Sequence, residues 1–229
     1  MPVFRLAEHL NLFPSPLLAD PSGVLAVGGD LTVDRLKVAY SYGIFPWYSE
    51  DQPILWWFPD PRCVLYPDQF RISGSLRTTL RQAKFIVTFD RAFEHVIEHC
   101  QNIRRKDEAG TWIMPEMRDA YCALHRAGYA HSLEVWKGNK LVGGLYGVAM
   151  GRIFYGESMF SLETDASKVG LAHLVDVLVS KGFWAIDCQQ DTPHLRSLGA
   201  ELVDAKDFYD MIHRNQVAML QDGVRTTFP

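Results

Sequence analysis

Four apolar runs decide the fold of this chain: HSLEVW at 131–136, LVGGLYGVAM at 141–150, RIFYG at 152–156 and FWAIDC at 183–188. Turn residues separate the first three runs, and this pattern predicts two consecutive hairpins. A helical segment lies between the third run and the fourth. Because a strand that follows such a helix can return beside the strand that precedes it, the segment predicts an α+β fold.

The helical segment opens at Asp165 and carries apolar residues at 171, 174, 175 and 178, as the helical period requires. Lys181 and Gly182 supply a basic last turn and a stop signal. Similar patterns predict helices over 75–81, 93–97 and 115–124, and a strand over 85–89.

The first 65 residues differ from the rest of the chain. They are rich in turns and aromatic residues, and their frequent prolines argue against long helices and central strands. One short helix is predicted from Asp34 to Tyr40, with Thr32 as its cap. We therefore expect a small, irregular amino-terminal domain over 1–65 and the α+β fold over 66–229.

The composition is that of a globular protein. Of 229 residues, 48% are hydrophobic and 22% are charged, which excludes a disordered, collagenous or coiled-coil chain. We find no uncharged stretch that approaches the roughly 20 residues needed to cross a bilayer, and no secretory signal. Four cysteines without a C-x-x-C pair predict reduced thiols, so we expect a cytoplasmic protein.

The net charge of −4 is unevenly distributed. Residues 1–156 carry 17 basic and 16 acidic groups, whereas residues 157–229 carry 6 and 11. Arg71, Arg77, Arg81 and Lys84 form a cluster without an acidic group between them. This cluster could bind phosphates, or it could be a solvated helix face.

Two further patterns have both a chemical and a structural interpretation. His95 and His99 belong to an H-x-x-E-H pattern, which could bind zinc or could be the solvated face of a helix. Trp47 and Trp112 lie in loops, where an aromatic ring can stack on a base, although core packing is the commoner use of tryptophan.

Two carboxylates lie at the ends of predicted strands. Asp187 lies near the end of the fourth apolar run, and Gln189 would lie on the same face of an extended segment. A buried carboxylate there needs a partner or a chemical task, and it could also cap the next turn through Thr192 or Ser197. Glu157, just after the third run, raises the same question.

A series of short motifs occurs in order between residues 13 and 200: FPSP at 13–16, LAVGGDL at 25–31, AY at 39–40, GIFPW at 43–47, PILWW at 53–57, PDPR at 59–62, GTWI at 110–113, HSLEVW at 131–136, GESMFS at 156–161, ASK at 166–168, IDCQ at 186–189 and SLGA at 197–200. Together they resemble the leucyl/phenylalanyl-tRNA–protein transferase family.

The resemblance implies an enzyme that moves leucine or phenylalanine, and methionine less well, from aminoacyl-tRNA to another protein. The acceptor would begin with arginine or lysine, and the new peptide bond would mark it for degradation through the N-end rule. The implied fold joins a small amino-terminal domain to an N-acetyltransferase-like (GNAT-type) domain with a mixed, mostly antiparallel sheet. No cofactor or metal is implied, and we expect a monomer.

The resemblance also assigns the chemical step to Asp187 and Gln189. The carboxylate of Asp187 would polarise Gln189, whose side chain would take a proton from the α-amino group of the acceptor. The transfer is an aminolysis of an activated ester, so positioning could contribute as much as proton transfer.

Further residues would hold the substrates. Glu157 would suit a cationic acceptor residue. The terminal adenosine would contact Trp47 and Trp112. The amino-acid side chain would lie in a pocket of Leu145, Met159, Leu174, Leu178 and Ile186. The tRNA phosphates would contact Arg77, Arg81 and Lys84.

Two other classes of protein stay open. A binding module could hold aminoacyl-tRNA or basic protein termini and leave the ester intact. A zinc hydrolase could be built around His95 and His99.

Overall fold

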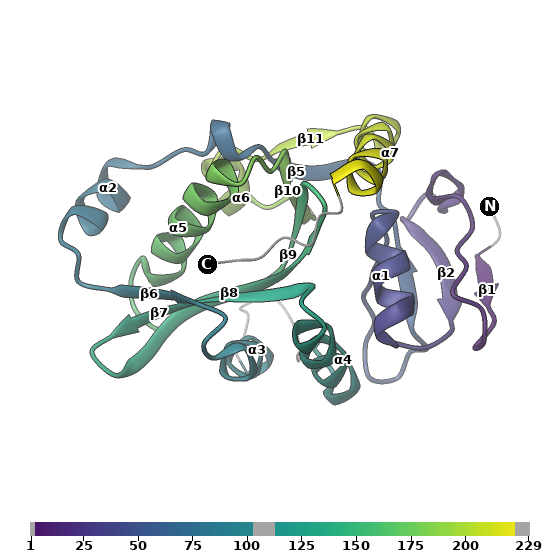
Figure 1. The fold of residues 1–229 in the computed structure, drawn as a ribbon, viewed down its shortest axis with the longest axis horizontal. Helices are drawn as coiled ribbons and strands as arrows, with labels where there is room; N and C mark the ends of the chain where they lie inside the picture. Colours follow the sequence, from purple (N-terminus) through teal and green to yellow (C-terminus); the bar gives the residue numbers. More distant parts are fainter. Residues whose placement is uncertain (1–2, 103–112, 223–229) are drawn as a thin grey trace.

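The computed structural model describes residues 3–102 and 113–222 of the chain. Its strands form two sheets, a small one near the amino terminus and a large one that crosses the rest of the molecule (Figure 1). Within the described residues, none of the helices combines the length and the hydropathy that crossing a membrane requires.

The large sheet has seven strands in the order β11, β5, β10, β9, β8, β7 and β6. They are β5 (Arg62–Leu65), β6 (Ile86–Phe89), β7 (Ala130–Lys137), β8 (Lys140–Met150), β9 (Ile153–Ser161), β10 (Ala185–Gln189) and β11 (Glu201–Val203). β10 runs parallel to β9, and the other neighbouring pairs are antiparallel. The predicted α+β class and the mixed, mostly antiparallel sheet are therefore confirmed.

The predicted pair of hairpins is also confirmed, because β7, β8 and β9 pair in succession. β9 extends beyond the predicted end at residue 156 and reaches Ser161. The register between β8 and β9 shifts between Tyr146 and Gly147. A β-carbon at position 147 would lie 2.2 Å from the carbonyl oxygen of Tyr155, so this irregularity requires glycine.

Helices cover both faces of the large sheet (Figure 1). α5 (Ala166–Ser180) packs on β7 and β8, α2 (Gly74–Arg81) packs against α5, and the short α6 (Pro193–Ser197) lies beside them. α3 (Phe93–Asn102) and α4 (Pro115–Arg126) cover the opposite face. The sheet is therefore buried on both sides, as its long apolar strands require.

The ends of α5 match the sequence signals in part. Gly182 follows the helix with a φ of 70°, which is the predicted glycine stop. Asp165 precedes the first turn, but its side chain does not cap the helix. Its carboxylate instead accepts hydrogen bonds from Thr79 Oγ1 at 3.2 Å and Lys168 Nζ at 3.1 Å, and so ties α5 to α2.

The small sheet contains β1 (Phe4–Leu6), β2 (Val24–Gly28), β4 (Leu55–Trp57) and β3 (Phe45–Pro46), in that order. α1 (Val33–Ser41) lies against it, and Thr32 Oγ1 accepts the backbone N–H of Arg35, as predicted for a cap. Single-turn 3₁₀ helices lie at Pro16–Leu18 and Pro67–Gln69. The amino-terminal part is thus more regular than its proline content indicates.

Among the elements that were not expected from the sequence, β5 and α7 connect the two parts of the chain. β5 is an interior strand of the large sheet, although it follows Pro61 in a segment where central strands were not expected. α7 (Ala205–Asp222) packs Phe208, Met211 and Ile212 into the same core as α1. The domain boundary at residue 65 stays a prediction. β5 and α7 each bring parts of the chain from the two sides of this boundary into contact.

Candidate active site

A cavity of about 470 Å³ lies where β10 separates from β9. The two strands pair in parallel up to Asp187 and Tyr155, after which β9 continues alongside β8 to Ser161. β10 ends at Gln189. The space between the separating strands is lined by residues 156–159 on one side and by Ile186 and residues 188–190 on the other.

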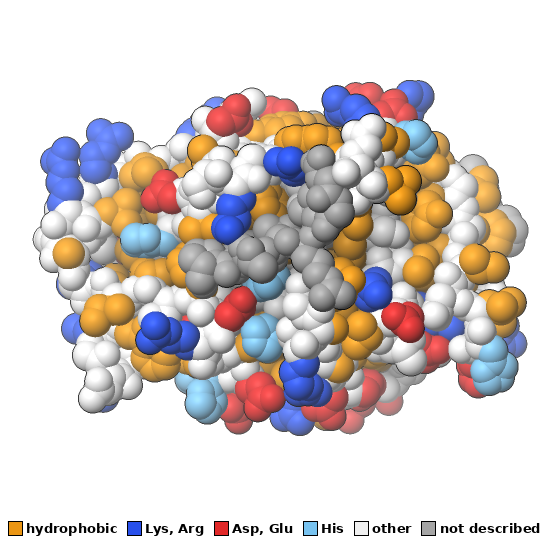
Figure 2. All heavy atoms as spheres, viewed as in Figure 1, with side chains coloured by type: hydrophobic (Ala, Val, Ile, Leu, Met, Phe, Trp, Pro, Cys, Tyr) orange, Lys and Arg blue, Asp and Glu red, His pale blue; other side chains and the backbone are white. Residues whose placement is uncertain are grey.

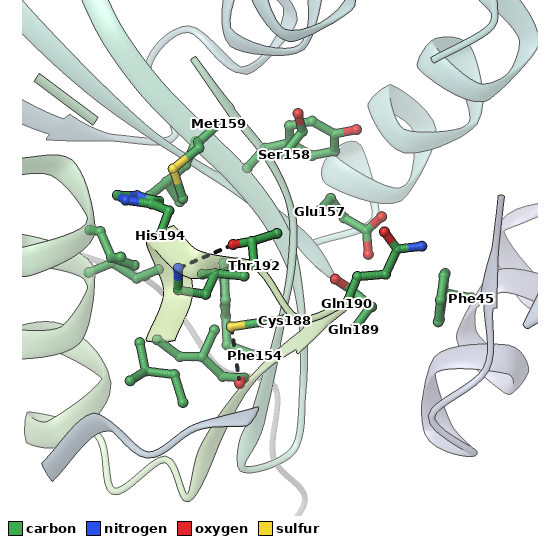
Figure 3. Close-up of a pocket in the computed structure, with 18 of the residues that line it drawn as sticks. Phe45, Phe154, Glu157, Ser158, Met159, Cys188, Gln189, Gln190, Thr192 and His194 are labelled. Atoms are coloured by element: carbon green, nitrogen blue, oxygen red, sulfur yellow. Dashed lines mark hydrogen bonds between the residues drawn. The ribbon is translucent and has the colours of Figure 1, made fainter. Parts of the chain in front are cut away.

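The cavity has an apolar end and a polar end. Figure 3 shows Met159 and His194 on one side of it, and Glu157, Gln190 and Phe45 on the other. The apolar end is formed by side chains of the core between the sheet and α5, namely Leu65, Leu145, Phe154, Met159, Leu171, Leu174, Ile186 and Leu195. This end can hold an apolar group of the size of an amino-acid side chain.

Most of the predicted amino-acid pocket lies together at this apolar end. Leu145, Met159, Leu174 and Ile186 all line the cavity. Leu178 does not line it and lies fully buried one helical turn beyond Leu174. Leu178 supports the packing of α5 on the sheet rather than the cavity wall.

At the polar end, Glu157 lies beside two buried tyrosines. Its Oε1 accepts a hydrogen bond from Tyr40 Oη at 2.7 Å, and its Oε2 accepts one from Tyr121 Oη at 2.9 Å. The two hydroxyls also contact each other. Tyr40 comes from α1 and Tyr121 from α4, so three separate parts of the chain meet at this carboxylate.

The surroundings of Glu157 change its acidity. Burial raises the pKa of Glu157 to about 7, although the hydrogen bonds from Tyr40 and Tyr121 lower it. Burial and the nearby carboxylate hold the pKa values of both tyrosines well above the ordinary value, so they remain donors. Glu157 therefore lines the cavity as a carboxyl group that can take up or release a proton near neutral pH.

Asp187 lies next to the cavity but does not line it. Its side chain is fully buried, and Arg62 binds both carboxylate oxygens, with Nε 2.8 Å from Oδ1 and Nη2 2.6 Å from Oδ2. This bidentate pair joins β10 to β5. The alternative in which Asp187 caps the next turn through Thr192 or Ser197 is wrong, because its carboxylate binds Arg62 and the N–H of Gln189, whereas Thr192 Oγ1 accepts the N–H of Leu195 and Ser197 Oγ donates to the carbonyl oxygen of His194.

Gln189 lines the cavity, but the chain is not extended there. Its φ is 54°, in the left-handed region, and its backbone N–H donates to Asp187 Oδ1 at 2.9 Å. The register of β10 against β5 shifts between the same two residues. The prediction that the two side chains share one face of an extended strand is therefore wrong. Such backbone outliers persist where neighbouring contacts enforce them, often at functional sites.

Trp47 directly follows β3 and lines the cavity from the amino-terminal side. Its ring centroid lies 5.4 Å from that of Trp57, and its carbonyl oxygen accepts the indole N–H of Trp57. Trp112 lies outside the described residues. Of the two residues predicted to contact the adenosine, the structure therefore places only Trp47.

The predicted phosphate contacts lie away from the cavity. Arg77 and Arg81 are exposed on α2, and Lys84 is exposed just after it. Figure 2 shows Lys and Arg side chains gathered at the end of the molecule that α2 occupies in Figure 1. None of the three residues lines the cavity.

The histidine pair of α3 has the structural surroundings of a solvated helix face. His95 is exposed, and the ring of His99 stacks on Phe160 with centroids 4.7 Å apart. Val96, Ile97 and Cys100 are buried on the other side. Among the described residues, no set of three His, Cys, Asp or Glu side chains is arranged to hold a metal ion.

Several cavity or supporting residues were not singled out from the sequence. Tyr40 and Arg62 belong to the quoted motifs, but no local pattern indicates that they face Glu157 and Asp187. Tyr121 occupies an apolar position of the helix predicted over 115–124, and nothing in the sequence distinguishes it from a core residue. His194 and Gln190, which also line the cavity, carry no distinguishing spacing.

Comparison with known proteins identifies the relatives of this chain. The family model described as Leucyl/phenylalanyl-tRNA protein transferase matches residues 64–213, and that of the N-terminal domain matches residues 29–60. A leucyl/phenylalanyl-tRNA–protein transferase of Syntrophobacter fumaroxidans is 58% identical over 215 residues, 94% of this chain and 92% of the relative. One from Desulfatibacillum aliphaticivorans is 54% identical over 93% of this chain and 91% of the relative.

Solved structures align less closely. A GCN5-related N-acetyltransferase from Kribbella flavida covers 73% of this chain and 62% of its own, with 12% identity and a TM-score of 0.38. The C-terminal domain of a putative lysylphosphatidylglycerol synthetase from Agrobacterium fabrum covers 73% and 67%, with 11% identity and a TM-score of 0.42.

The relatives place the chain among the aminoacyltransferases, a class of enzyme. Within that class it belongs to the leucyl/phenylalanyl-tRNA–protein transferase family, which transfers leucine or phenylalanine from tRNA to protein. The resemblance seen in the motifs is therefore confirmed, and an enzyme is favoured over a pure binding module.

Proposed function

We propose that donor and acceptor meet in the cavity between β9 and β10. The leucine or phenylalanine side chain of the donor occupies the apolar end, against Leu174 and Ile186, and methionine fits there less well. The amino terminus of the acceptor enters the polar end beside Glu157. The observation that carries this proposal is that one cavity joins an apolar end to the half-buried residue Glu157.

The acceptors in this proposal begin with arginine or lysine. A carboxylate in a partly buried site favours a cationic group within a few ångströms, which is why Glu157 suits both the α-ammonium and a basic side chain. The modified protein carries a new amino-terminal leucine or phenylalanine. We propose that this residue marks the protein for degradation through the N-end rule.

The chemical step is an aminolysis of the ester that links the amino acid to the terminal ribose. The acceptor nitrogen attacks the ester carbonyl carbon, the C–N bond forms, and the bond from that carbon to the ribose oxygen breaks. The nitrogen releases a proton to the protein, and the ribose oxygen takes one up. Because the ester is already activated, the step requires positioning and proton transfer but no cofactor or metal.

Gln189 and Glu157 are the groups that can receive the proton in this proposal. A neutral amide is a weak base, so Gln189 contributes mainly by hydrogen bonding to the attacking nitrogen. Glu157, with a pKa of about 7, can hold the proton that the nitrogen loses. The carboxylate of Asp187, already bound by Arg62, supports Gln189 through its backbone N–H.

Trp47, together with Trp112, would stack the terminal adenosine of the tRNA, and Arg77, Arg81 and Lys84 would contact its phosphates. These contacts are few, which predicts a shallow dependence of tRNA binding on salt. The proposal also includes action as a monomer in the cytoplasm.

A transfer assay with matched peptides tests the proposal. Labelled leucine, phenylalanine or methionine on tRNA is mixed with peptides that differ only in the first residue, arginine, lysine, alanine or glutamate. The proposal predicts label on the arginine and lysine peptides, with methionine the weakest donor. Equal labelling of all four peptides, or cleavage of the ester without a labelled peptide, would contradict it.

A further inference from the structure

We infer that Arg62 is a positioning residue for transfer, because it holds the two opposite walls of the cavity in register. This inference rests on the proposed function of the cavity and names a residue that does not itself line it. Arg62 is fully buried at the start of β5. Its effect on the reaction would therefore pass through the groups that it binds.

On one side, Arg62 fixes the wall formed by β10. Nε and Nη2 bind the two oxygens of Asp187 at 2.8 and 2.6 Å, a fork that leaves the carboxylate one orientation. In that orientation Oδ1 accepts the N–H of Gln189 at 2.9 Å. The backbone at Gln189 has a φ of 54°, and this contact helps to stabilise it.

On the other side, Arg62 fixes the amino-terminal wall. Nη2 also donates to the carbonyl oxygen of Gly43 at 2.7 Å. The guanidinium carbon lies 4.9 Å from the ring centroid of Phe45. Phe45 and Trp47 line the cavity on this side. One guanidinium thus contacts the turn that carries Trp47 and the strand end that carries Gln189.

The chemistry of the contact requires arginine. Nη2 donates to Asp187 Oδ2 and to the carbonyl oxygen of Gly43, which belong to different walls, and Nε donates to Asp187 Oδ1. Only a planar guanidinium with several N–H donors can make these contacts together. The rings of Phe58 and Phe208, with centroids 5.4 and 4.7 Å from the guanidinium carbon, complete its surroundings. A lysine ammonium restores the charge but not the three directed contacts.

Arg62→Lys separates positioning from simple neutralisation of Asp187. We expect a folded protein whose kcat for transfer falls by about 100-fold, with KM for aminoacyl-tRNA within about 3-fold of wild type, because the apolar end is untouched. Arg35→Lys is the matched control. Arg35 is equally buried and binds Asp30 and the carbonyl oxygens of Ala7 and Leu10, none of which lines the cavity.

The outcomes separate the inference from the proposed function. Absence of transfer by wild type and by Arg35→Lys would overturn the proposed function. Transfer by both, with kcat of Arg62→Lys within about 3-fold of Arg35→Lys, would overturn the inference alone. A large loss of kcat in Arg62→Lys, with KM little changed, supports it.

Amide hydrogen exchange gives a second readout that needs no activity. In Arg62→Lys, exchange should increase in the segments 43–48 and 185–190 but not in β7 and β8. If this variant does not fold, the double variant Arg62→Met with Asp187→Asn removes both buried charges together and is measured in its place. Unchanged exchange in both segments of a folded variant would overturn the inference.

Discussion

Glu157→Gln should leave the stability of the protein almost unchanged at acidic pH and raise it at alkaline pH. The ordinary pKa of the carboxyl group, 4.5, rises to about 7 in the folded protein, chiefly through burial. Between these values the folded state holds a proton that the unfolded chain releases. Stability is therefore lost as the pH rises through this window, and it is not regained above it.

The magnitude follows from the two pKa values. At about 1.4 kcal/mol per pH unit, the interval from 4.5 to about 7 gives an upper bound of about 3.5 kcal/mol. Because part of the side chain faces the cavity, we expect about 2 kcal/mol. Glutamine does not ionise and, like the protonated carboxyl group, it offers one acceptor oxygen and one donor group to Tyr40 and Tyr121. The variant should match wild type within about 0.5 kcal/mol at pH 4 and be more stable by about 2 kcal/mol at pH 9.

Urea unfolding at several pH values between about 4 and 9 measures this difference. Glu50→Gln, at an exposed position in the turn before β4, is the control for the loss of one negative charge. The difference in unfolding free energy between Glu157→Gln and wild type should rise by about 2 kcal/mol across this range. A constant difference across the range, as expected for the control, would refute the assignment of a raised pKa to Glu157.

Three further predictions concern other parts of the site. Asp187→Ala should lower the unfolding free energy by about 3–5 kcal/mol, because it leaves the Arg62 guanidinium buried without a counter-charge; an unchanged thermal midpoint would contradict this. Leu174→Phe should narrow the apolar end and shift the ratio of leucine to phenylalanine transfer toward leucine by about 10-fold, and an unchanged ratio in competition assays would exclude this pocket. Replacing Arg77 and Arg81 together by alanine should weaken tRNA binding and reduce its salt slope by about 2; a retained slope would place the phosphate contacts elsewhere.

The local parts of the fold could be predicted from the sequence because they depend on local patterns. The helical period of α5, the Thr32 cap of α1 and the turn residues between β7, β8 and β9 all occur where the sequence indicates. β5 could not be predicted in this way. It is short and follows proline, and its place in the sheet depends on pairing with β10, more than 100 residues later in the chain.

The candidate site shows the same limit. The apolar residues of the cavity could be grouped through the family resemblance, and four of the five line it. The partners of the charged residues could not be predicted, because they are distant in the sequence. Arg62 and Asp187 are 125 positions apart, and Tyr40 and Glu157 are 117 apart. The left-handed backbone at Gln189 depends on those distant contacts, and a strand period applied to the sequence gives the wrong orientation.

The central claim is that donor and acceptor meet in the cavity between β9 and β10. The most direct test is a crystal structure of the protein bound to a phenylalanyl-adenosine analogue in which an amide replaces the ester. The account predicts the phenyl ring at the apolar end, between Leu174 and Ile186, the adenine on Trp47, and the amide near Gln189. A bound analogue whose phenyl ring lies outside the cavity would contradict the account.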